Sequence, residues 1–224
     1  MIKNISNLGD AALYCDFGKE VNKDTNTKVI KYFKSIKKEK IEGINNLTPS
    51  YNKLIVSFDL KKTNYSNVKR LIENLSVDIQ GDLKSNKIEI PVCIDKNFAL
   101  DMQRLEEKLK TSREKIYENF FNKEFFCYMT GFIAGMPFLG DLDVDMRAKR
   151  LETPRVKVPK GSVGITEQFA NIYTFESPGG WNIIGNTPLN IFDSSNEKDP
   201  NLVNPGDLVR FKEITKNEFE NYNE

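Results

Sequence analysis

Apolar residues in the first part of the chain recur with two different periods. Short apolar runs at 13–15, 41–47 and 54–58 predict strands, and a turn at 49–52 separates the last two. A further run, Ile88 to Val92, predicts another strand. These segments alternate with segments of helical spacing, so the two kinds of element are expected to share one domain.

The helical spacing occurs at 29–36 and again at 68–75, where apolar residues fall at i, i+3, i+4 and i+7. The resulting order is strand, helix, strand, strand, helix, strand. This order predicts a ferredoxin-like sandwich over residues 1–92, with both helices on one face of an antiparallel sheet.

The pattern changes after residue 92. Residues 93–123 have helical spacing, with Thr111 and Glu114 at capping-box distance, and predict a helical connection. From 124 to 214 the apolar runs are short and punctuated by Gly and Pro, which predicts a β-barrel. Residues 215–224 lose this pattern and are expected to form a frayed tail. The fold class is therefore α+β.

Charge gives little reason to expect a polyanionic partner. Lys and Arg number 33 against 32 Asp and Glu, a net charge of +1, so neither nucleic acid nor an anionic membrane is expected to bind. Lys34, Lys37, Lys38 and Lys40 are interpreted as the solvated side of a helix end, because acidic residues follow closely. An anion-binding patch is the alternative.

The sequence lacks both a membrane-spanning run and histidine, which limits the expected location of the protein and the reactions it can catalyse. No apolar run approaches the ~18 residues that a membrane span needs, and Met1 is not followed by a signal-type stretch, so a cytoplasmic protein is expected. The chain contains no histidine, which excludes Ser-His-Asp and Cys-His relays and histidine zinc sites. Cys15, Cys93 and Cys127 have apolar neighbours and are expected to be small buried residues without metal or redox chemistry.

Candidate chemistry gathers in four Gly- and Pro-containing elements, at 131–140, 153–155, 158–165 and 177–185. Glycine lets backbone N–H groups approach a ligand, and successive N–H groups can hold a phosphate, a carboxylate or an oxyanion. Arg155 is a candidate clamp for an anionic group, and Trp181 a candidate pocket floor. The alternative is that the glycines serve chain reversal and the tryptophan belongs to the core.

In their order and spacing, these elements resemble the B subunit of bacterial 5-oxoprolinase. The same family includes the Kip-type inhibitor of a sensor histidine kinase and allophanate hydrolase subunit 1, also called carboxyltransferase domain 1. The carrying motifs are Gly-Phe-x-x-Gly-x-Pro-Phe-Leu-Gly at 131–140, Thr-Pro-Arg at 153–155, Val-Pro-x-Gly-Ser-Val-Gly-Ile at 158–165, Ser-Pro-Gly-Gly-Trp-x-Ile-Ile-Gly-x-Thr-Pro-Leu at 177–189 and Pro-Gly-Asp-x-Val-Arg-Phe at 205–211. Weaker matches in the first ninety residues extend the resemblance over nearly the whole chain.

The resemblance implies a ferredoxin-like domain followed by a cyclophilin-like β-barrel. It implies part of a lactam hydrolase that opens 5-oxoproline to glutamate with ATP, working with a carboxyltransferase-domain-2-like C-type subunit and an A-type subunit. ATP is the expected cofactor, with another subunit of the complex as an alternative place for its binding, and no metal or biotin is indicated in this chain. Within the barrel, Arg155 is expected to orient a carboxylate or phosphate and Ser162 to donate a hydrogen bond. The positions expected to line the substrate pocket are Gly135, Pro137, Gly161, Gly164, Tyr173, Pro178, Gly179, Gly180 and Trp181.

Some positions depart from the family pattern. Ala134 and Met136 replace a proline and an aromatic residue, and 166–174 replaces a segment that carries a Gln-Thr pair in the family. The retained positions are largely turn formers, whereas the replaced ones are polar, so the fold is expected to persist with a changed substrate or activity. Two alternatives therefore stay open: a non-catalytic protein of the kinase-inhibitor type, and an allophanate hydrolase or carboxyltransferase-like component.

Overall fold

The structure is a computed structural model that describes residues 1–222. It divides into two compact units, one of residues Met1–Lys84 and one that starts at Ser85. Each unit has its own hydrophobic core. Among the described residues, none of the helices combines the length and apolar character that crossing a bilayer requires.

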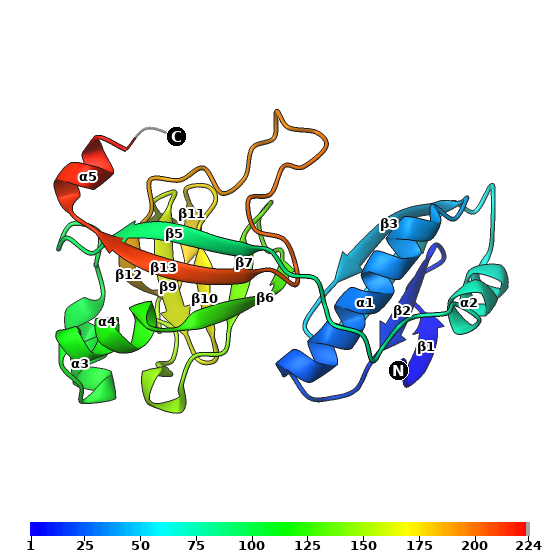
Figure 1. Ribbon diagram of the computed structural model, residues 1–224, viewed down its shortest axis with the longest axis horizontal. Coiled ribbons are helices and arrows are strands. Elements are labelled where there is room, and N and C mark those ends of the chain that lie inside the picture. Colours follow the sequence, from blue (N-terminus) through cyan, green and yellow to red (C-terminus); the bar gives the residue numbers. More distant parts are fainter. Residues whose placement is uncertain (223–224) are drawn as a thin grey trace. The chain divides into compact units, whose positions relative to one another are not determined.

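The first unit contains a four-stranded antiparallel sheet in the order β1-β2-β4-β3 (Figure 1). Its elements are β1 (Asn4–Asn7), β2 (Ala12–Asp16), α1 (Lys23–Glu39), β3 (Ile44–Pro49), β4 (Lys53–Phe58) and α2 (Tyr65–Glu73). Asn22 and Asn64 cap the two helices, each accepting a hydrogen bond from a backbone N–H of the first turn. Residues of both helices share one core with alternate residues of the strands, so both helices cover the same face of the sheet.

One strand expected in this sheet lies in the other unit. The run at 88–92 forms β5 (Lys87–Cys93), which pairs in parallel with β13 (Leu208–Ile214) and also contacts β12 (Asn182–Asn186). The edge position beside β2 is occupied by β1, which the sequence does not predict. Alternation shows which face of a strand is buried but not which sheet the strand joins, and Ile90 and Val92 are buried in the barrel core.

The second unit is a closed barrel in the strand order β10-β7-β6-β13-β5-β12-β9. Its remaining strands are β6 (Glu124–Thr130), β7 (Pro137–Gly140), β9 (Ser162–Thr166) and β10 (Phe169–Ile172). A short 3-10 helix, η1 (Val144–Met146), follows β7. A separate two-stranded ribbon consists of β8 (Arg155–Val158) and β11 (Ser177–Gly179). The predicted barrel is therefore confirmed.

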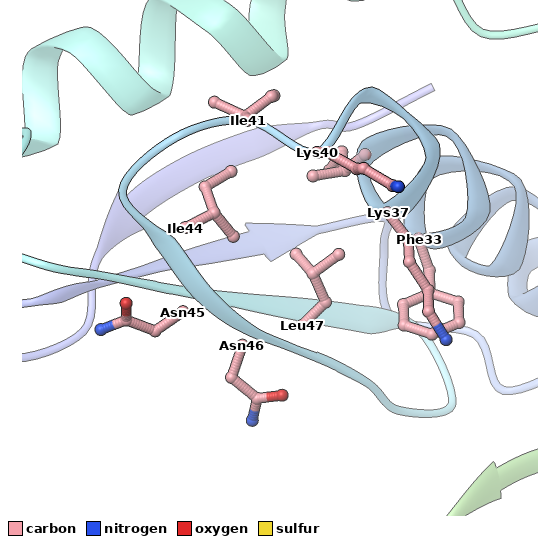
Figure 2. Close-up of a pocket in the computed structure, with 9 residues that line it drawn as sticks. Phe33, Lys37, Lys40, Ile41, Ile44, Asn45, Asn46 and Leu47 are labelled. Carbon is pink, nitrogen blue, oxygen red and sulfur yellow. The ribbon is translucent and has the colours of Figure 1, made fainter. Parts of the chain in front are cut away.

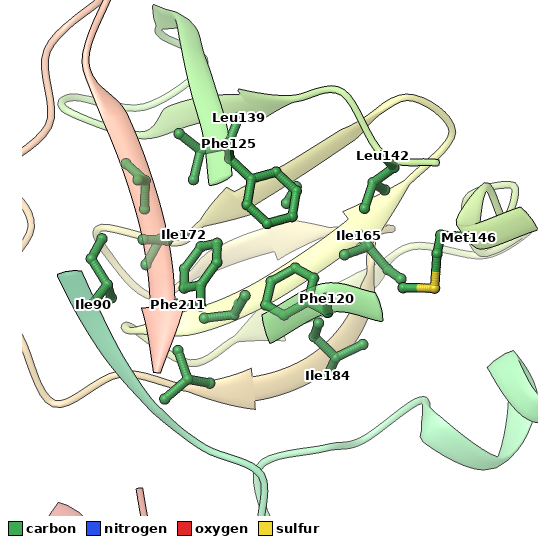
Figure 3. Packing of buried hydrophobic residues seen from close by; sticks show 14 of the residues in the cluster. Ile90, Phe120, Phe125, Leu139, Leu142, Met146, Ile165, Ile172, Ile184 and Phe211 are labelled. Atoms are coloured by element: carbon green, nitrogen blue, oxygen red, sulfur yellow. The ribbon is translucent and has the colours of Figure 1, made fainter. Parts of the chain in front are cut away.

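Aromatic rings fill the barrel core (Figure 3). Phe120 stacks on Phe211 with ring centroids 4.7 Å apart, and both contact Phe125. Phe120 belongs to α4 (Arg113–Phe121), and Leu105 of α3 (Met102–Leu109) lies in the same cluster. The helices at 93–123 therefore belong to the barrel core rather than acting only as a connection.

The segment expected to fray contains a short helix, α5 (Lys216–Glu220). Thr215 and Glu218 form a reciprocal capping box at its start, and the Phe219 ring lies 4.5 Å from that of Phe98. These contacts order the segment up to residue 222, and residues 223–224 of the predicted tail lie outside the described part.

The three cysteines are buried, as their apolar neighbours predict. Burial raises the pKa of the Cys15 thiol to about 12 and also raises that of Cys127. The thiolate is the reactive form, so we expect negligible reaction of the native protein with Ellman's reagent at pH 8 and reaction of all three thiols in guanidinium. Rapid labelling of a native thiol would contradict this burial.

Candidate functional site

Four neighbouring strands of the barrel present a row of side chains to the outside. Phe138, Asn171, Gly164 and Ile183 are paired in register across β7, β10, β9 and β12. The residues next to them in each strand point into the barrel core. The row is therefore an outer wall, opposite to the face that fills the barrel.

A small apolar cluster covers this wall. Its buried members are Met136, Val158, Tyr173, Trp181 and Ile183, here called the outer cluster. Val158 comes from the β8–β11 ribbon, whereas Ile183 comes from the barrel. The outer cluster thus lies between the ribbon and the wall, and it contains two of the sequence-predicted residues, Tyr173 and Trp181.

Tyr173 is the residue around which several predicted positions meet. The Gly161 N–H donates to the Tyr173 carbonyl at 2.7 Å, and the Tyr173 N–H donates to the Ser162 carbonyl at 2.9 Å. A Cβ atom on Gly179 would collide with the Tyr173 hydroxyl, so the glycine allows the ring to pack there. The structure therefore brings Gly161, Ser162, Tyr173 and Gly179 together.

The backbone groups that were expected to meet a ligand are bonded within the chain. The Gly161 N–H is used by Tyr173, and the Ser162 N–H donates to the Pro159 carbonyl at 3.2 Å. A Cβ on Gly164 would lie 2.8 Å from Asn171 Oδ1 and 3.0 Å from Trp181 Cβ. These glycines serve close packing in this structure.

The Tyr173 phenol is held in its neutral form. Burial raises its pKa, and the neighbouring Asn171 carboxamide, the Trp181 backbone N–H and the charges of Arg150 and Arg155 oppose this rise only in part. A neutral phenol retains its O–H, so Tyr173 can act as a hydrogen-bond donor at neutral pH.

Arg155 forms a two-pronged ion pair with Asp101. Its two terminal nitrogens lie 2.9 and 2.6 Å from the two carboxylate oxygens. The Asp101 side chain is only 5% exposed and also accepts the Ile183 N–H at 2.7 Å, whereas the Arg155 side chain is 28% exposed. The guanidinium group of Arg155 therefore already binds a carboxylate of this chain through both terminal nitrogens. The exposed part of the side chain is what remains accessible to an anionic ligand.

The remaining predicted positions have other packing partners, apart from Trp181, whose backbone N–H also meets the Tyr173 hydroxyl. Gly135 accommodates Phe192, whose ring atom would be 2.5 Å from an added Cβ, and buried Pro137 begins β7. Pro178 is exposed in the ribbon, and the Gly180 carbonyl accepts the Leu151 N–H at 2.7 Å. Trp181 packs edge-to-face on Phe138, with centroids 5.6 Å apart.

Asn171 is a candidate site residue that the motifs in the sequence do not mark. Its side chain is fully buried, the Oδ1 atom has no hydrogen-bond partner, and Nδ2 is 3.9 Å from the Met136 sulfur. Buried polar groups are nearly always satisfied, so an unpaired carboxamide oxygen here requires an explanation. An asparagine in the middle of the apolar run 169–172 is the sequence signal that was available.

Comparison with known proteins gives consistent matches over both units. The family model described as "Carboxyltransferase domain, subdomain C and D" matches residues 3–203. The chain is 32% identical over 232 residues to the B subunit of 5-oxoprolinase from Bacillus subtilis, covering 98% of this chain and 96% of that protein. It is 23% identical to urea amidolyase of Saccharomyces cerevisiae, over 96% of this chain and 13% of that protein.

A solved structure, TTHA0988, superposes with a TM-score of 0.82 at 27% identity. It covers 92% of this chain, whereas this chain spans only 40% of TTHA0988. The resemblance expected from the Gly- and Pro-containing motifs is therefore confirmed. The chain belongs to the carboxyltransferase-domain family of subdomains C and D, together with the B subunits of bacterial 5-oxoprolinases.

Proposed function

We propose that this chain is the B-type subunit of an ATP-dependent complex that opens the 5-oxoproline ring to glutamate. The observation that carries the proposal is the 32% identity to the B subunit of a 5-oxoprolinase over nearly the full length of both proteins. In this reaction water adds across the ring amide bond while ATP is hydrolysed. A C-type and an A-type partner complete the complex in the cytoplasm, and ATP binds outside this chain.

The same proposal includes the two fold families. The first unit is a ferredoxin-like sandwich in which β1 takes the place of the expected fourth strand, and the second unit is a cyclophilin-like barrel. Support comes from the sheet order β1-β2-β4-β3 with two helices on one face, and from the closed barrel.

The outer cluster, with Phe138 and Asn171 of the wall beneath it, offers the groups that a cyclic amide would need. The unpaired Asn171 Oδ1 can accept the ring N–H, and the neutral Tyr173 phenol can donate to the ring carbonyl. Trp181 and Phe138 supply apolar surface for the ring methylenes. Because Asn171 and Tyr173 are buried, entry requires the β8–β11 ribbon to move, and the partner subunits are the candidates for moving it.

The test is an affinity pull-down of the tagged chain from its native lysate, followed by an assay of 5-oxoproline-dependent ATP hydrolysis. Recovery of carboxyltransferase-like partners with substrate-stimulated turnover is expected. Recovery of partners without 5-oxoproline-dependent ATP hydrolysis would contradict the proposal that 5-oxoproline is the substrate. Cyclic ureas and allophanate would then be assayed, because the urea amidolyase match covers 96% of this chain.

A substitution of Asn171 distinguishes a role in substrate binding from a role in stability. Replacing Asn171 with leucine removes a buried, unpaired oxygen together with the carboxamide N–H that interacts with the Tyr173 phenol; the two effects oppose one another, so we expect the free energy of unfolding to change by no more than about 1 kcal/mol. In the reconstituted complex the same variant should lower turnover about 100-fold. A substantial loss of stability, or undiminished turnover, would contradict the assignment.

A further inference from the structure

The first unit has an open groove that the proposed function does not use. Its cavity of about 450 Å³ lies between the end of α1 and the edge strand β3. Phe33 and Ile36 of α1, Ile41 of the connecting loop, and Ile44 and Leu47 of β3 form its apolar part. In Figure 2, Ile44 and Leu47 point to the groove side of β3, whereas Asn45 and Asn46 point away.

The groove runs beside a strand with an unpaired backbone edge. β3 is the last strand in the order β1-β2-β4-β3. Ser50 and Lys53 form a hydrogen-bonded pair next to β3 and β4, because the Ser50 N–H donates to the Lys53 carbonyl at 2.8 Å. Along an antiparallel pair of strands, hydrogen-bonded and non-hydrogen-bonded residue pairs alternate. Thr48 opposite Ile55 is therefore a bonded pair, and the N–H and C=O of Leu47, opposite Val56, face the open edge.

The charged side chains that line this groove are both cationic. Lys37 and Lys40 stand at its rim, and Lys37 Nζ lies 5.8 Å from the centre of the Phe33 ring. Lys34 and Lys38, both exposed, lie on the same end of α1. The favourable interaction of lysines with the helix C-terminus explains their presence in part, but not their position over an apolar groove.

We propose that the β3 edge binds an extended, acidic segment of a partner protein as a fifth strand. The Leu47 backbone would bond to the segment, and its apolar side chains would enter the groove beside Ile44 and Leu47. Its carboxylates, two positions from an apolar residue and therefore on the same face of the added strand, would face Lys37 and Lys40. Strand addition of this kind gives affinity through main-chain bonds and specificity through side-chain pockets. The β-bulge at Ile44/Asn46 and Pro49 limit the free edge to a few residues, so the segment is short.

The probe is a fluorescein-labelled octapeptide, Thr-Val-Thr-Glu-Thr-Val-Thr-Glu, in which Val and Glu alternate along one face of the strand, titrated with the full chain by fluorescence polarisation. Saturable binding is expected for this peptide and none for the matched peptide that has Lys in place of Glu. Lys37→Glu combined with Lys40→Glu should weaken binding at least about tenfold. The control pair Lys19→Glu with Lys61→Glu, exposed residues of the same unit with the same change in charge, should leave binding unaltered.

Backbone pairing is tested separately. Leu47→Pro removes the outward N–H without removing a β3–β4 bond and should abolish binding, whereas Leu47→Ala retains the N–H and should weaken binding only moderately. If Leu47→Pro does not fold, hydrogen exchange of the unaltered chain tests the same point. Adding the peptide should then protect the Leu47 amide from exchange.

Three outcomes of the binding assays would overturn the proposal. They are no saturable binding up to about 1 mM peptide, equal binding of the two peptides, or equal loss in the control pair. Leu47 protection that rises with protein concentration in the absence of peptide would also overturn it, because the occupant would then be a second copy of this chain.

Discussion

Replacing Arg155 with alanine is expected to lower the free energy of unfolding by about 3 kcal/mol. The reason is the carboxylate that remains. Asp101 is 5% exposed, and without the guanidinium only the Ile183 N–H and its own surroundings would stabilise its charge. Urea unfolding followed by circular dichroism at pH 7 measures the change.

The neighbouring ion pair of Lys157 and Glu176 is a matched control. Lys157 is also on β8, and its Nζ lies 2.9 Å from Glu176, but the two side chains are 73% and 56% exposed. Lys157→Ala should therefore have little effect on stability, since the pair is screened by solvent. If Arg155→Ala costs no more than Lys157→Ala, the Asp101 pair contributes little. A loss of complex turnover in that case would support the anion-orienting role expected from the sequence.

The Arg155 example shows what the sequence could and could not provide. Thr-Pro-Arg at 153–155 marked the residue, but its partner Asp101 is 54 positions away in a different element, and no local pattern connects the two. The wrong sheet predicted for β5 has the same cause, a partner that is distant in the sequence. Its alternation predicted a strand correctly, whereas its pairing with β13 joins residues more than a hundred positions apart.

The barrel was easier to predict than its site. Short apolar runs separated by Gly and Pro predict strands and turns from the local sequence alone. The position of the unpaired Asn171 oxygen depends on three strands meeting at Phe138, Asn171 and Gly164. The first unit illustrates the same limit, since the sequence shows four lysines near 34–40 but not the groove that two of them line.

Gly161 provides the second large expected effect. Its φ of +80° is unfavourable for other residues, and an added Cβ would collide with the Thr187 carbonyl oxygen and lie 2.5 Å from Asn186 Oδ1. The Thr187 N–H donates to the Gly161 carbonyl at 2.9 Å, so the colliding backbone is fixed to the glycine itself. Gly161→Ala should therefore cost about 3 kcal/mol or more in unfolding free energy, from backbone strain and overpacking together.

Gly180 is the matched control for this change. It also comes from a Gly-containing motif, but the nearest atom to an added Cβ is 3.6 Å away, at Pro154 Cγ. Gly180→Ala should change the unfolding free energy by no more than about 0.5 kcal/mol. Equal stability of both variants, with turnover lost only in Gly161→Ala, would contradict the packing role and restore Gly161 as a ligand contact. The expected order, a large loss at 161 and almost none at 180, would show that close packing against Asn186 and Thr187 is what requires the glycine of Val-Pro-Lys-Gly-Ser.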